Sequence, residues 1–165
     1  MPFFALALSA ELSNVTRLGP SDIEEFRWHL KFRCQSCEEV SEKWHWAVLT
    51  EGSSIDLSSS RGAAQFAEKC PGCGRVNTLR VVEKSFKEYS IEKNGQFQHI
   101  ARFECRGMVP IEFKPSDGWH CYGEETDTHF DDIDLSEDWA EYDEKAQLPV
   151  EINNVRAEFV KVKDR

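Results

Sequence analysis

Residues 26–37 read FRWHLKFRCQSC, and residues 70–73 read CPGC. Each segment contains a Cys-x-x-Cys pair, and thirty-two residues lie between the two pairs. A Cys-x-x-Cys turn brings two thiolates to one side of the backbone, so two such turns can supply the four sulfurs of a tetrahedral zinc site. The predicted ligands of one Zn²⁺ ion are Cys34, Cys37, Cys70 and Cys73.

The predicted zinc site is structural. Zinc accepts four thiolates at about 2.3 Å in tetrahedral geometry, which leaves no open position for a water molecule. Such a site can contribute on the order of 10 kcal/mol to folding. Two alternatives use the same cysteines: a dithiol–disulfide cycle at one pair, or an iron–sulfur cluster on all four. The redox alternative needs an exposed thiol of low pKa, typically at a helix N-terminus, and neither pair begins a predicted helix.

The segment before Cys34 contains the clearest strand in the sequence. Its apolar side chains alternate with polar and basic ones, which predicts one buried and one exposed face. The alternation resumes after the turn, and a second pair of strands is predicted around Cys70, at about 64–69 and 76–82. A strand, a cysteine knuckle and a return strand form the hairpin of a zinc ribbon. The residues expected to face the core are Phe26, Trp28, Leu30 and Phe32 before the turn, and Val40, Trp44, Trp46 and Val48 after it.

Further strands are predicted at 4–12, 97–105 and 155–162, because apolar residues alternate in each segment. Residues 51–62 are rich in Ser and Gly, which predicts a flexible loop between the two cysteine pairs. No segment predicts a long helix. The chain is therefore expected to be all-β, and its 165 residues are expected to form a single domain, residues 1–165.

The sequence also contains an internal similarity at a constant offset of 71 residues. It aligns the segment around Cys34 with the segment around Cys105, and Cys37 with Met108. We interpret it as a repeat whose second copy has lost its metal ligands, with a chance match between two short strands as the alternative. The repeat predicts a barrel-like or sandwich fold with pseudo-twofold symmetry. Its expected halves are residues 1–83, which carry the zinc-ribbon-like site, and residues 84–165, which are metal-free.

The chain is acidic, with a formal net charge of -10. Nucleic-acid binding needs a basic surface, so this charge argues against it, although Lys and Arg residues near the cysteines keep RNA or DNA contact as an alternative. Residues 122–144 carry eleven acidic residues and no Lys or Arg. Because Ile133, Leu135, Trp139 and Tyr142 interrupt this segment, part of it is expected to pack on the body and the rest to form a solvated loop or docking surface.

The sequence also bears on location. No run of eighteen apolar residues predicts a membrane span, and the apolar opening at residues 1–8 lacks the positive start of a signal peptide. Reduced, metal-binding cysteines favour the cytoplasm, with the nucleus as a further location, over a secreted disulfide scaffold. The expectation is a cytoplasmic protein.

Catalysis is not predicted. Cys105 and Cys121 lie outside the zinc motif, and we interpret both as buried core thiols. His120 is next to Cys121, but neighbours in a strand point to opposite faces, which weakens a catalytic pairing. The sequence has no glycine-rich phosphate loop, no G-x-S-x-G elbow and no H-E-x-x-H motif.

Several longer motifs accompany the cysteine pairs. They are FFALAL at 3–8, NVT at 14–16, FRW at 26–28, SEKW at 41–44, FECRG at 103–107, DW at 138–139 and YDEKAQ at 142–147. With the two pairs they resemble the eukaryotic family of CXXC-motif-containing zinc-binding proteins, a family of unknown function, over essentially the whole chain. The resemblance implies a barrel-like all-β fold of two similar halves, zinc ligation by the two pairs, and partners that include the metal-binding domain of a copper chaperone.

The residues and the resemblance together predict a zinc-binding protein that acts as a protein-interaction module without catalysis. The alternative is a thiol- or metal-handling protein, which would use the Cys-x-x-Cys pairs directly. The expected partners are proteins, with no nucleic acid and no membrane, and the expected state is a monomer.

Overall fold

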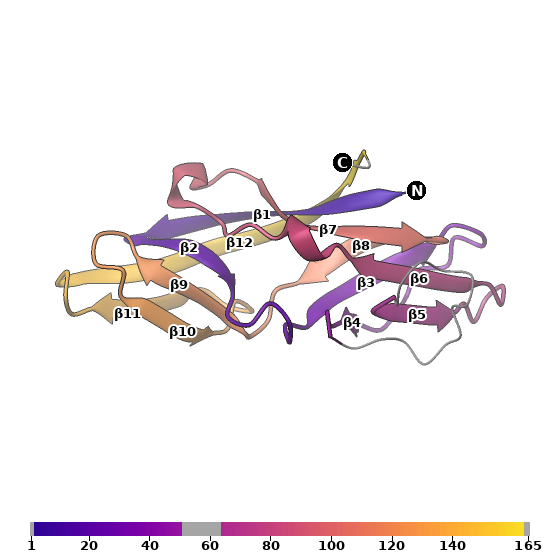
Figure 1. Cartoon of the computed structure of the whole chain (residues 1–165), viewed down its shortest axis with the longest axis horizontal. Helices are drawn as coiled ribbons and strands as arrows, with labels where there is room; N and C mark the ends of the chain where they lie inside the picture. The colour runs from indigo at the N-terminus through magenta and orange to yellow at the C-terminus, as the bar shows by residue number, and fades with distance from the viewer. Residues whose placement is uncertain (1, 51–63, 164–165) are drawn as a thin grey trace.

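The computed structural model describes residues 2–50 and 64–163 (Figure 1). This part of the chain consists of β-strands and two short 3-10 turns, η1 and η2, and contains no α-helix, which confirms the all-β prediction. The predicted loop at 51–62 lies outside the described residues. The strands and turns are β1 Phe3–Ser13, β2 Val15–Pro20, β3 Trp28–Cys34, β4 His45–Ala47, β5 Phe66–Lys69, β6 Val76–Val81, η1 Glu83–Ser85, η2 Ile91–Lys93, β7 Gln98–Arg106, β8 Met108–Lys114, β9 Trp119–Gly123, β10 His129–Ile133, β11 Trp139–Asp143 and β12 Leu148–Val162.

The described strands form a six-stranded sheet in the order β11-β12-β1-β7-β6-β5 and two three-stranded sheets, β10-β9-β2 and β4-β3-β8. The long strands β1 and β12 run along the molecule and connect its two ends (Figure 1). Leu6 of β1 pairs with Phe159 of β12 on one side and with Ala101 of β7 on the other. Residues 3–10 are all buried, because both faces of β1 are covered.

The strand orders have pseudo-twofold symmetry. Each strand can be matched with the strand six places later in the chain, so that β1 corresponds to β7 and β3 to β9. Under this match the six-stranded sheet has the same strand order read in reverse, and the β4-β3-β8 sheet corresponds to the β10-β9-β2 sheet. The doubled architecture is therefore confirmed. The two sequence halves interleave, because β2 pairs with β9 and β8 pairs with β3.

The register of the repeat that the sequence suggested is wrong. An offset of 71 residues equates β3 with β7, but the strand order makes β9 the counterpart of β3. Trp28 opens β3 and Trp119 opens β9; both are fully buried, and neither indole N–H has a hydrogen-bond partner among the described residues. Alternating apolar residues are common to any half-buried strand, so the offset aligned two strands that are not structural equivalents.

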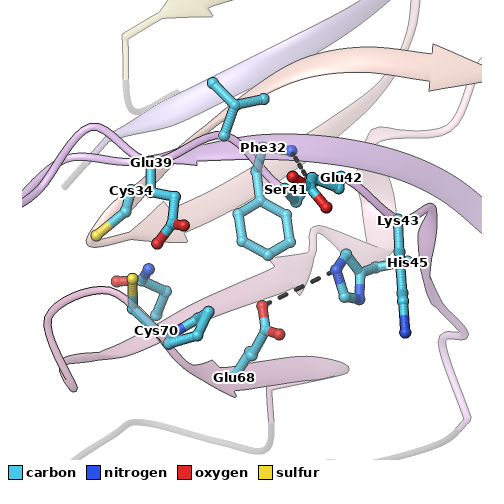
Figure 2. A pocket seen from close by; sticks show the side chains of 12 residues that line it. Phe32, Cys34, Glu39, Ser41, Glu42, Lys43, His45, Glu68 and Cys70 are labelled. Atoms are coloured by element: carbon cyan, nitrogen blue, oxygen red, sulfur yellow. Dashed lines mark hydrogen bonds and ion pairs between the residues drawn. The ribbon is translucent and has the colours of Figure 1, made fainter.

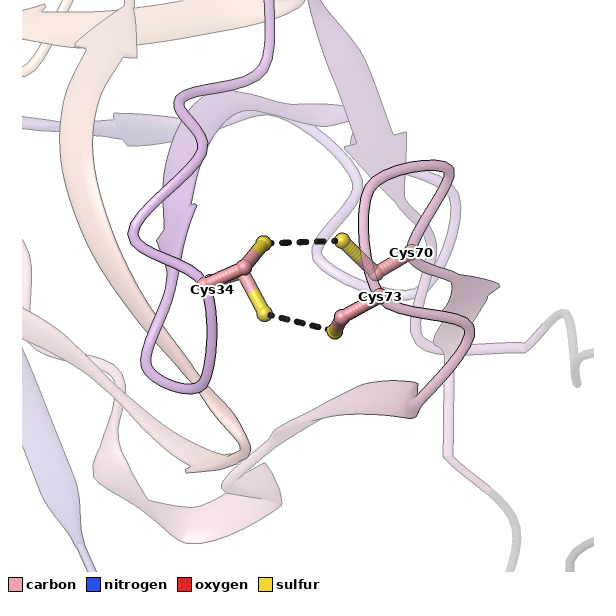
Figure 3. A group of neighbouring side chains, drawn as sticks. Cys34, Cys70 and Cys73 are labelled. Carbon is pink, nitrogen blue, oxygen red and sulfur yellow. Dashed lines mark hydrogen bonds between the residues drawn. The ribbon is translucent and has the colours of Figure 1, made fainter.

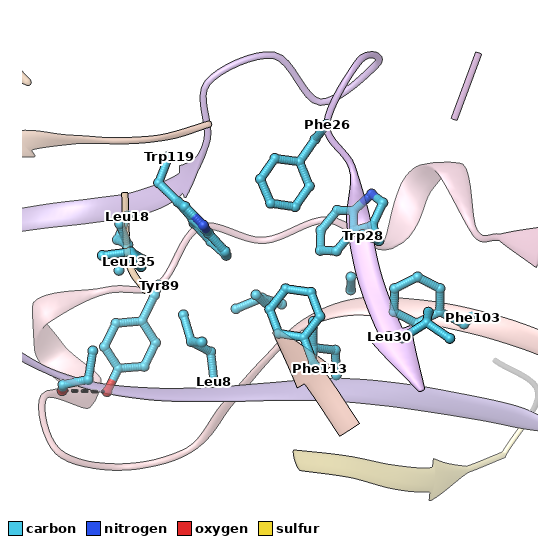
Figure 4. Packing of buried hydrophobic residues seen from close by; sticks show 14 of the residues in the cluster. Leu8, Leu18, Phe26, Trp28, Leu30, Tyr89, Phe103, Phe113, Trp119 and Leu135 are labelled. Atoms are coloured by element: carbon cyan, nitrogen blue, oxygen red, sulfur yellow. Dashed lines mark hydrogen bonds between the residues drawn. The ribbon is translucent and has the colours of Figure 1, made fainter. Parts of the chain in front are cut away.

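The aromatic core lies between these two tryptophans (Figure 4). Phe26 packs edge-on against Trp28 at 4.6 Å and against Trp119 at 5.1 Å between ring centroids. Such edge-to-face pairs add about 0.5–1.5 kcal/mol beyond the area that they bury. Tyr89 is also fully buried, and its hydroxyl donates to the carbonyl of Lys93 at 2.6 Å. The core therefore extends through both halves.

The side chains predicted to face the core are buried in β3 but only partly after the knuckle. In β4 the buried residue is Ala47, whereas the side chain of Trp46 is 49 % exposed, and Val40 is exposed as well. The prediction placed Trp46 inward because it extended one alternation through a loop. The acidic segment does pack on the body: Ile133 and Leu135 are buried, and Trp139 contacts the core.

Candidate metal centre

The two Cys-x-x-Cys turns face each other (Figure 3). The first follows β3 and the second follows β5, so each belongs to a different sheet. The sulfurs of Cys34 and Cys73 are 3.8 Å apart, those of Cys37 and Cys70 are 3.5 Å apart, and all four lie within 4.8 Å of one another. Four thiolates at about 2.3 Å from a tetrahedral zinc would lie about 3.8 Å apart. The four predicted cysteines are thus placed to hold one zinc ion.

Both turns have the same backbone geometry. Cys34 N–H donates to the carbonyl of Glu39 at 2.9 Å, and Cys70 N–H donates to that of Arg75 at 2.7 Å. The fifth residue of each turn is left-handed, Glu38 with a φ of 65° and Gly74 with a φ of 78°. These knuckles turn their sulfurs to one side of the backbone.

Gly72 permits the close approach of the knuckles. A Cβ at this position would lie 2.3 Å from Oε2 of Glu39 and 3.2 Å from Sγ of Cys37. A larger residue here would force the exposed Glu39 side chain to move and would crowd the sulfur of Cys37. Glycine therefore gives the two chain segments room to approach.

The cluster has a buried side and an exposed side. Cys34 and Cys70 are buried, whereas Cys37 and Cys73 are exposed. On the buried side, the side chain of Asn77 donates to Cys34, and this hydrogen bond is the largest of the effects that lower the pKa of that thiol, to about 6. Zinc binds the thiolate form, so Asn77 favours the ligating state of Cys34.

The pKa of Cys37 is shifted in the opposite direction when no metal is bound. A hydrogen bond from the backbone N–H of Glu39 lowers its pKa, but hydrogen bonding with Cys70, burial and the other two thiols outweigh it and raise the pKa to about 12. Four thiols so close together cannot all ionise without a cation between them. Deprotonation of the full set is therefore coupled to binding of the metal.

Sequence reasoning missed Asn77 and its neighbour Gly107. Asn77 is 2 % exposed. A Cβ on Gly107 would lie 2.4 Å from Oδ1 of Asn77, so glycine leaves room for the amide. A signal was present: Asn77, Leu79 and Val81 alternate on the buried face of β6, so a polar side chain occupies a core position directly after the second knuckle. Such a buried amide usually has a specific partner.

The two remaining cysteines are not part of this cluster. Cys105 and Cys121 are fully buried, and burial raises the pKa of both thiols, that of Cys121 to about 12. Their places in the core match the interpretation made from the sequence. Neither thiol is activated as a nucleophile in this setting.

A pocket of about 340 Å³ opens beside the cysteines (Figure 2). Phe32 lines it, and so do His45 and Glu68, which approach each other to 3.9 Å between Nε2 and Oε2. Glu39 and Glu42 add two more carboxylates to the lining. The walls come from both cysteine-bearing segments, so a metal that joins these segments also holds the pocket in shape.

The other half repeats both knuckles without cysteine. Gly123 N–H donates to the carbonyl of Thr128 at 2.8 Å, which reproduces the bond that closes the first knuckle, and Asp127 takes the left-handed position with a φ of 57°. The second loop begins at Asp143, and Gln147 is its left-handed residue. The residues at the four cysteine positions are Gly123, Thr126, Asp143 and Ala146.

A hydrogen-bonded carboxylate joins these two loops. Asp143 is 1 % exposed and accepts from the hydroxyl of Thr126 at 2.5 Å and from that of Thr128 at 2.9 Å. We call Thr126, Thr128 and Asp143 the carboxylate clasp. The expectation that the second copy had lost its ligands at Cys105 and Met108 is thus corrected, because the equivalent loops lie at 123–128 and 143–148 and are closed by the clasp.

An all-β fold whose two knuckles present four convergent thiolates defines a zinc-binding protein. Residues 5–160 match the model of the family described as CXXC motif containing zinc binding protein, eukaryotic. The chain belongs to this family.

Relatives match over almost their full length. The chain is 45 % identical to a UPF0587 protein of Caenorhabditis elegans, covering 99 % of this chain and 98 % of that protein. It is 44 % identical to the CXXC motif containing zinc binding protein of Homo sapiens, covering 95 % and 97 %. The solved structure named C1orf123 superimposes with a TM-score of 0.91 at 42 % identity, over 97 % of this chain and 99 % of that one. A hypothetical protein from Plasmodium falciparum superimposes with a TM-score of 0.84 at 28 % identity, over 97 % and 100 %.

In the described part of the chain, no helix has the length and apolar character needed to cross a membrane.

Proposed function

We propose that this zinc-binding protein is a non-catalytic protein-interaction module and that its zinc is structural. The main support for the proposal is that four cysteine sulfurs are placed to fill all four positions of one zinc ion. Two of them come from the turn after β3, in the β4-β3-β8 sheet, and two from the turn after β5, in the six-stranded sheet. A zinc ion with four thiolate ligands has no position left for a substrate. It instead links two sheets whose edges would otherwise separate.

The partner is proposed to be a protein with basic side chains. Three carboxylates line the pocket beside the cysteines, and most acidic side chains between residues 122 and 144 are exposed. Opposite charges would attract such a partner. The copper-chaperone metal-binding domain suggested by the family resemblance is one candidate. We further propose that the protein is a cytoplasmic monomer that contacts neither nucleic acid nor membrane. The net charge of -10 supports the absence of nucleic-acid contact.

An affinity experiment tests the interaction role. Tagged wild-type protein is compared with the charge-reversed variant Glu124→Lys/Glu125→Lys and with Glu42→Lys/Glu68→Lys, which alters the pocket. Glu83→Lys/Glu92→Lys is the matched control, since these carboxylates are exposed in the turns η1 and η2, outside both surfaces. Loss of one bound protein in a test variant and its retention in the control would support the proposal. Equal recovery from all four proteins would reject both acidic surfaces as the binding site.

A second candidate is a thiol- or metal-handling role, and the exposure of Cys37 and Cys73 favours it. A structural site should hold zinc against a moderate chelator and resist alkylation. Rapid transfer of zinc to the chelator, together with fast alkylation of these two thiols at neutral pH, would favour the handling role over the structural one.

A further inference from the structure

The β10-β9-β2 sheet carries a second group of metal-ligand side chains. We propose that His120, His129 and Asp131 bind a divalent transition-metal ion, independently of the four cysteines. These residues lie in the half of the molecule that has the carboxylate clasp (Figure 1). The site would add a second, more accessible metal to the established zinc-binding property.

Strand pairing brings the three side chains together. β9 and β10 are antiparallel, with Tyr122 opposite His129. His120 lies on the same face of β9 as Tyr122, and Asp131 on the same face of β10 as His129, whereas Cys121 between the first two is buried on the other face. The register also shifts between Phe130 and Ile133, next to Asp131. The sequence order of the three ligands gave no indication of this convergence.

The ligand atoms have the spacing that one metal ion needs. Nδ1 of His120 is 3.0 Å from Nε2 of His129, and one ligand atom from each of the three residues lies within 4.8 Å of the other two. Two imidazole nitrogens at about 2.0–2.1 Å from a tetrahedral zinc would be about 3.3 Å apart. A small movement of either ring would therefore admit an ion.

Neighbouring side chains lie beside each ligand. Oε2 of Glu88 is 3.9 Å from Nε2 of His120, the ring nitrogen that does not face His129. The Ser21 hydroxyl donates to Oδ1 of Asp131. Tyr122 stacks on His129, with 4.9 Å between ring centroids and 20° between the ring planes. Metal-binding histidines commonly have a carboxylate at the second ring nitrogen, which fixes the ring and raises its basicity.

The charges of the group also suit a cation. Burial, followed by the charge of His129, lowers the pKa of His120. The hydrogen bond from Ser21 is the largest effect that lowers the pKa of Asp131. A nearby cation, Arg17, is paired with Asp127 at 2.7 Å and lies 4.0 Å above the ring of Tyr122. Its charge is thus partly neutralised.

The ligand set points to a class of metal. Two imidazoles and one carboxylate suit zinc, cobalt, nickel or copper, whereas Ca²⁺ and Mg²⁺ prefer ligand sets made entirely of oxygen. Three protein ligands leave at least one position for water. His129 and Asp131 are exposed, so the ion would be reached from solvent.

Metal titration tests the site. Full-length protein already holding one zinc per chain is titrated with Zn²⁺ and with Co²⁺, followed by calorimetry and absorption. We expect a second equivalent to bind, and cobalt at this site to show no sulfur-to-metal charge-transfer band. His129→Ala and Asp131→Asn should abolish the second event, and Glu88→Gln should weaken it about tenfold or more. Asp132→Asn is the matched control, because it removes a neighbouring exposed charge outside the group.

The outcomes separate the alternatives. Binding of only one zinc by the wild type would overturn the proposal and leave His120 and His129 as a hydrogen-bonded pair. If Asp131→Asn and Asp132→Asn weakened binding of the second metal ion equally, the binding would reflect general attraction of cations by acidic side chains, and the proposed site would be rejected. Both His129 and Asp131 are exposed, and unchanged near-ultraviolet circular dichroism of their variants would show that folding is preserved.

Discussion

At the scale of single residues, a buried side chain outside the four cysteines favours the ligating form of the zinc cluster. Asn77 donates to Cys34 from a buried position. A donor to a thiolate stabilises the charged sulfur and fixes its orientation. The nearby Gly107, with a φ of 79°, makes room for the amide.

Asn77→Ala is expected to weaken zinc binding about tenfold, because the hydrogen bond to the Cys34 thiolate is lost. Competition with a chromogenic chelator measures the change. Thr78→Ala is the control, since its side chain lies on the opposite face of β6. An unchanged affinity in Asn77→Ala would show that this hydrogen bond does not contribute to the metal site.

At the scale of elements, each pair of knuckles is closed by a different chemistry. The loops after β3 and β5 converge through sulfur, whereas those after β9 and β11 converge through the carboxylate clasp. The same backbone turns thus serve a metal in one half and a buried carboxylate in the other. Since the hairpins are alike, the side chains that they carry decide which chemistry is used.

Asp143→Asn is expected to lower the melting temperature at neutral pH, because one acceptor of the clasp becomes a donor facing a hydroxyl group. The hydrogen bond from Thr126, the largest effect, lowers the pKa of Asp143 in the folded state. The stabilisation by the carboxylate is therefore fully present above the unfolded pKa of about 4 and is lost as the pH falls through the lower folded value.

Thermal unfolding at several pH values checks this prediction. The difference in melting temperature between wild type and Asp143→Asn should shrink on acidification below about pH 4. Glu144→Gln, at an exposed neighbouring position, should melt like the wild type at every pH. A difference that stays constant across the range would contradict the assigned ionisation.

At the scale of the whole molecule, the two sheets that carry the cysteines meet at the four-sulfur cluster. Cys34→Ser or Cys70→Ser should lose zinc and much of the folded population, because a structural zinc contributes about 10 kcal/mol and typical domains are stable by only about 5–15 kcal/mol. Zinc per chain and thermal unfolding measure both effects. Cys105→Ala should keep one zinc, and a Cys34→Ser protein that melts like the zinc-loaded wild type would refute the structural role.

Chelation of the zinc is expected to act unevenly on the fold. Amide hydrogen exchange should accelerate in β3, β4, β5 and β6, whose ends depend on the metal, and should change less in β9 to β12, whose loops are joined by the clasp. Uniform acceleration along the chain would instead indicate that the two halves unfold as one cooperative unit.

Much of the fold followed from local pattern. Alternation placed β1, β3 and β7, because a half-buried strand must present apolar side chains at every second residue. The same rule failed beyond the first knuckle, where a loop changed the phase and left Trp46 exposed. It also misaligned the repeat, since any two alternating strands resemble each other.

The sequence by itself determined the metal ligands and the all-β class, because the spacing of Cys34 and Cys37 and of Cys70 and Cys73 is a local property of the backbone. Only the tertiary structure decided which distant side chains became neighbours: Asn77 behind Cys34, Asp143 between Thr126 and Thr128, and His120 beside His129 and Asp131. Strand pairing and register set these contacts, and both depend on the packing of the whole core.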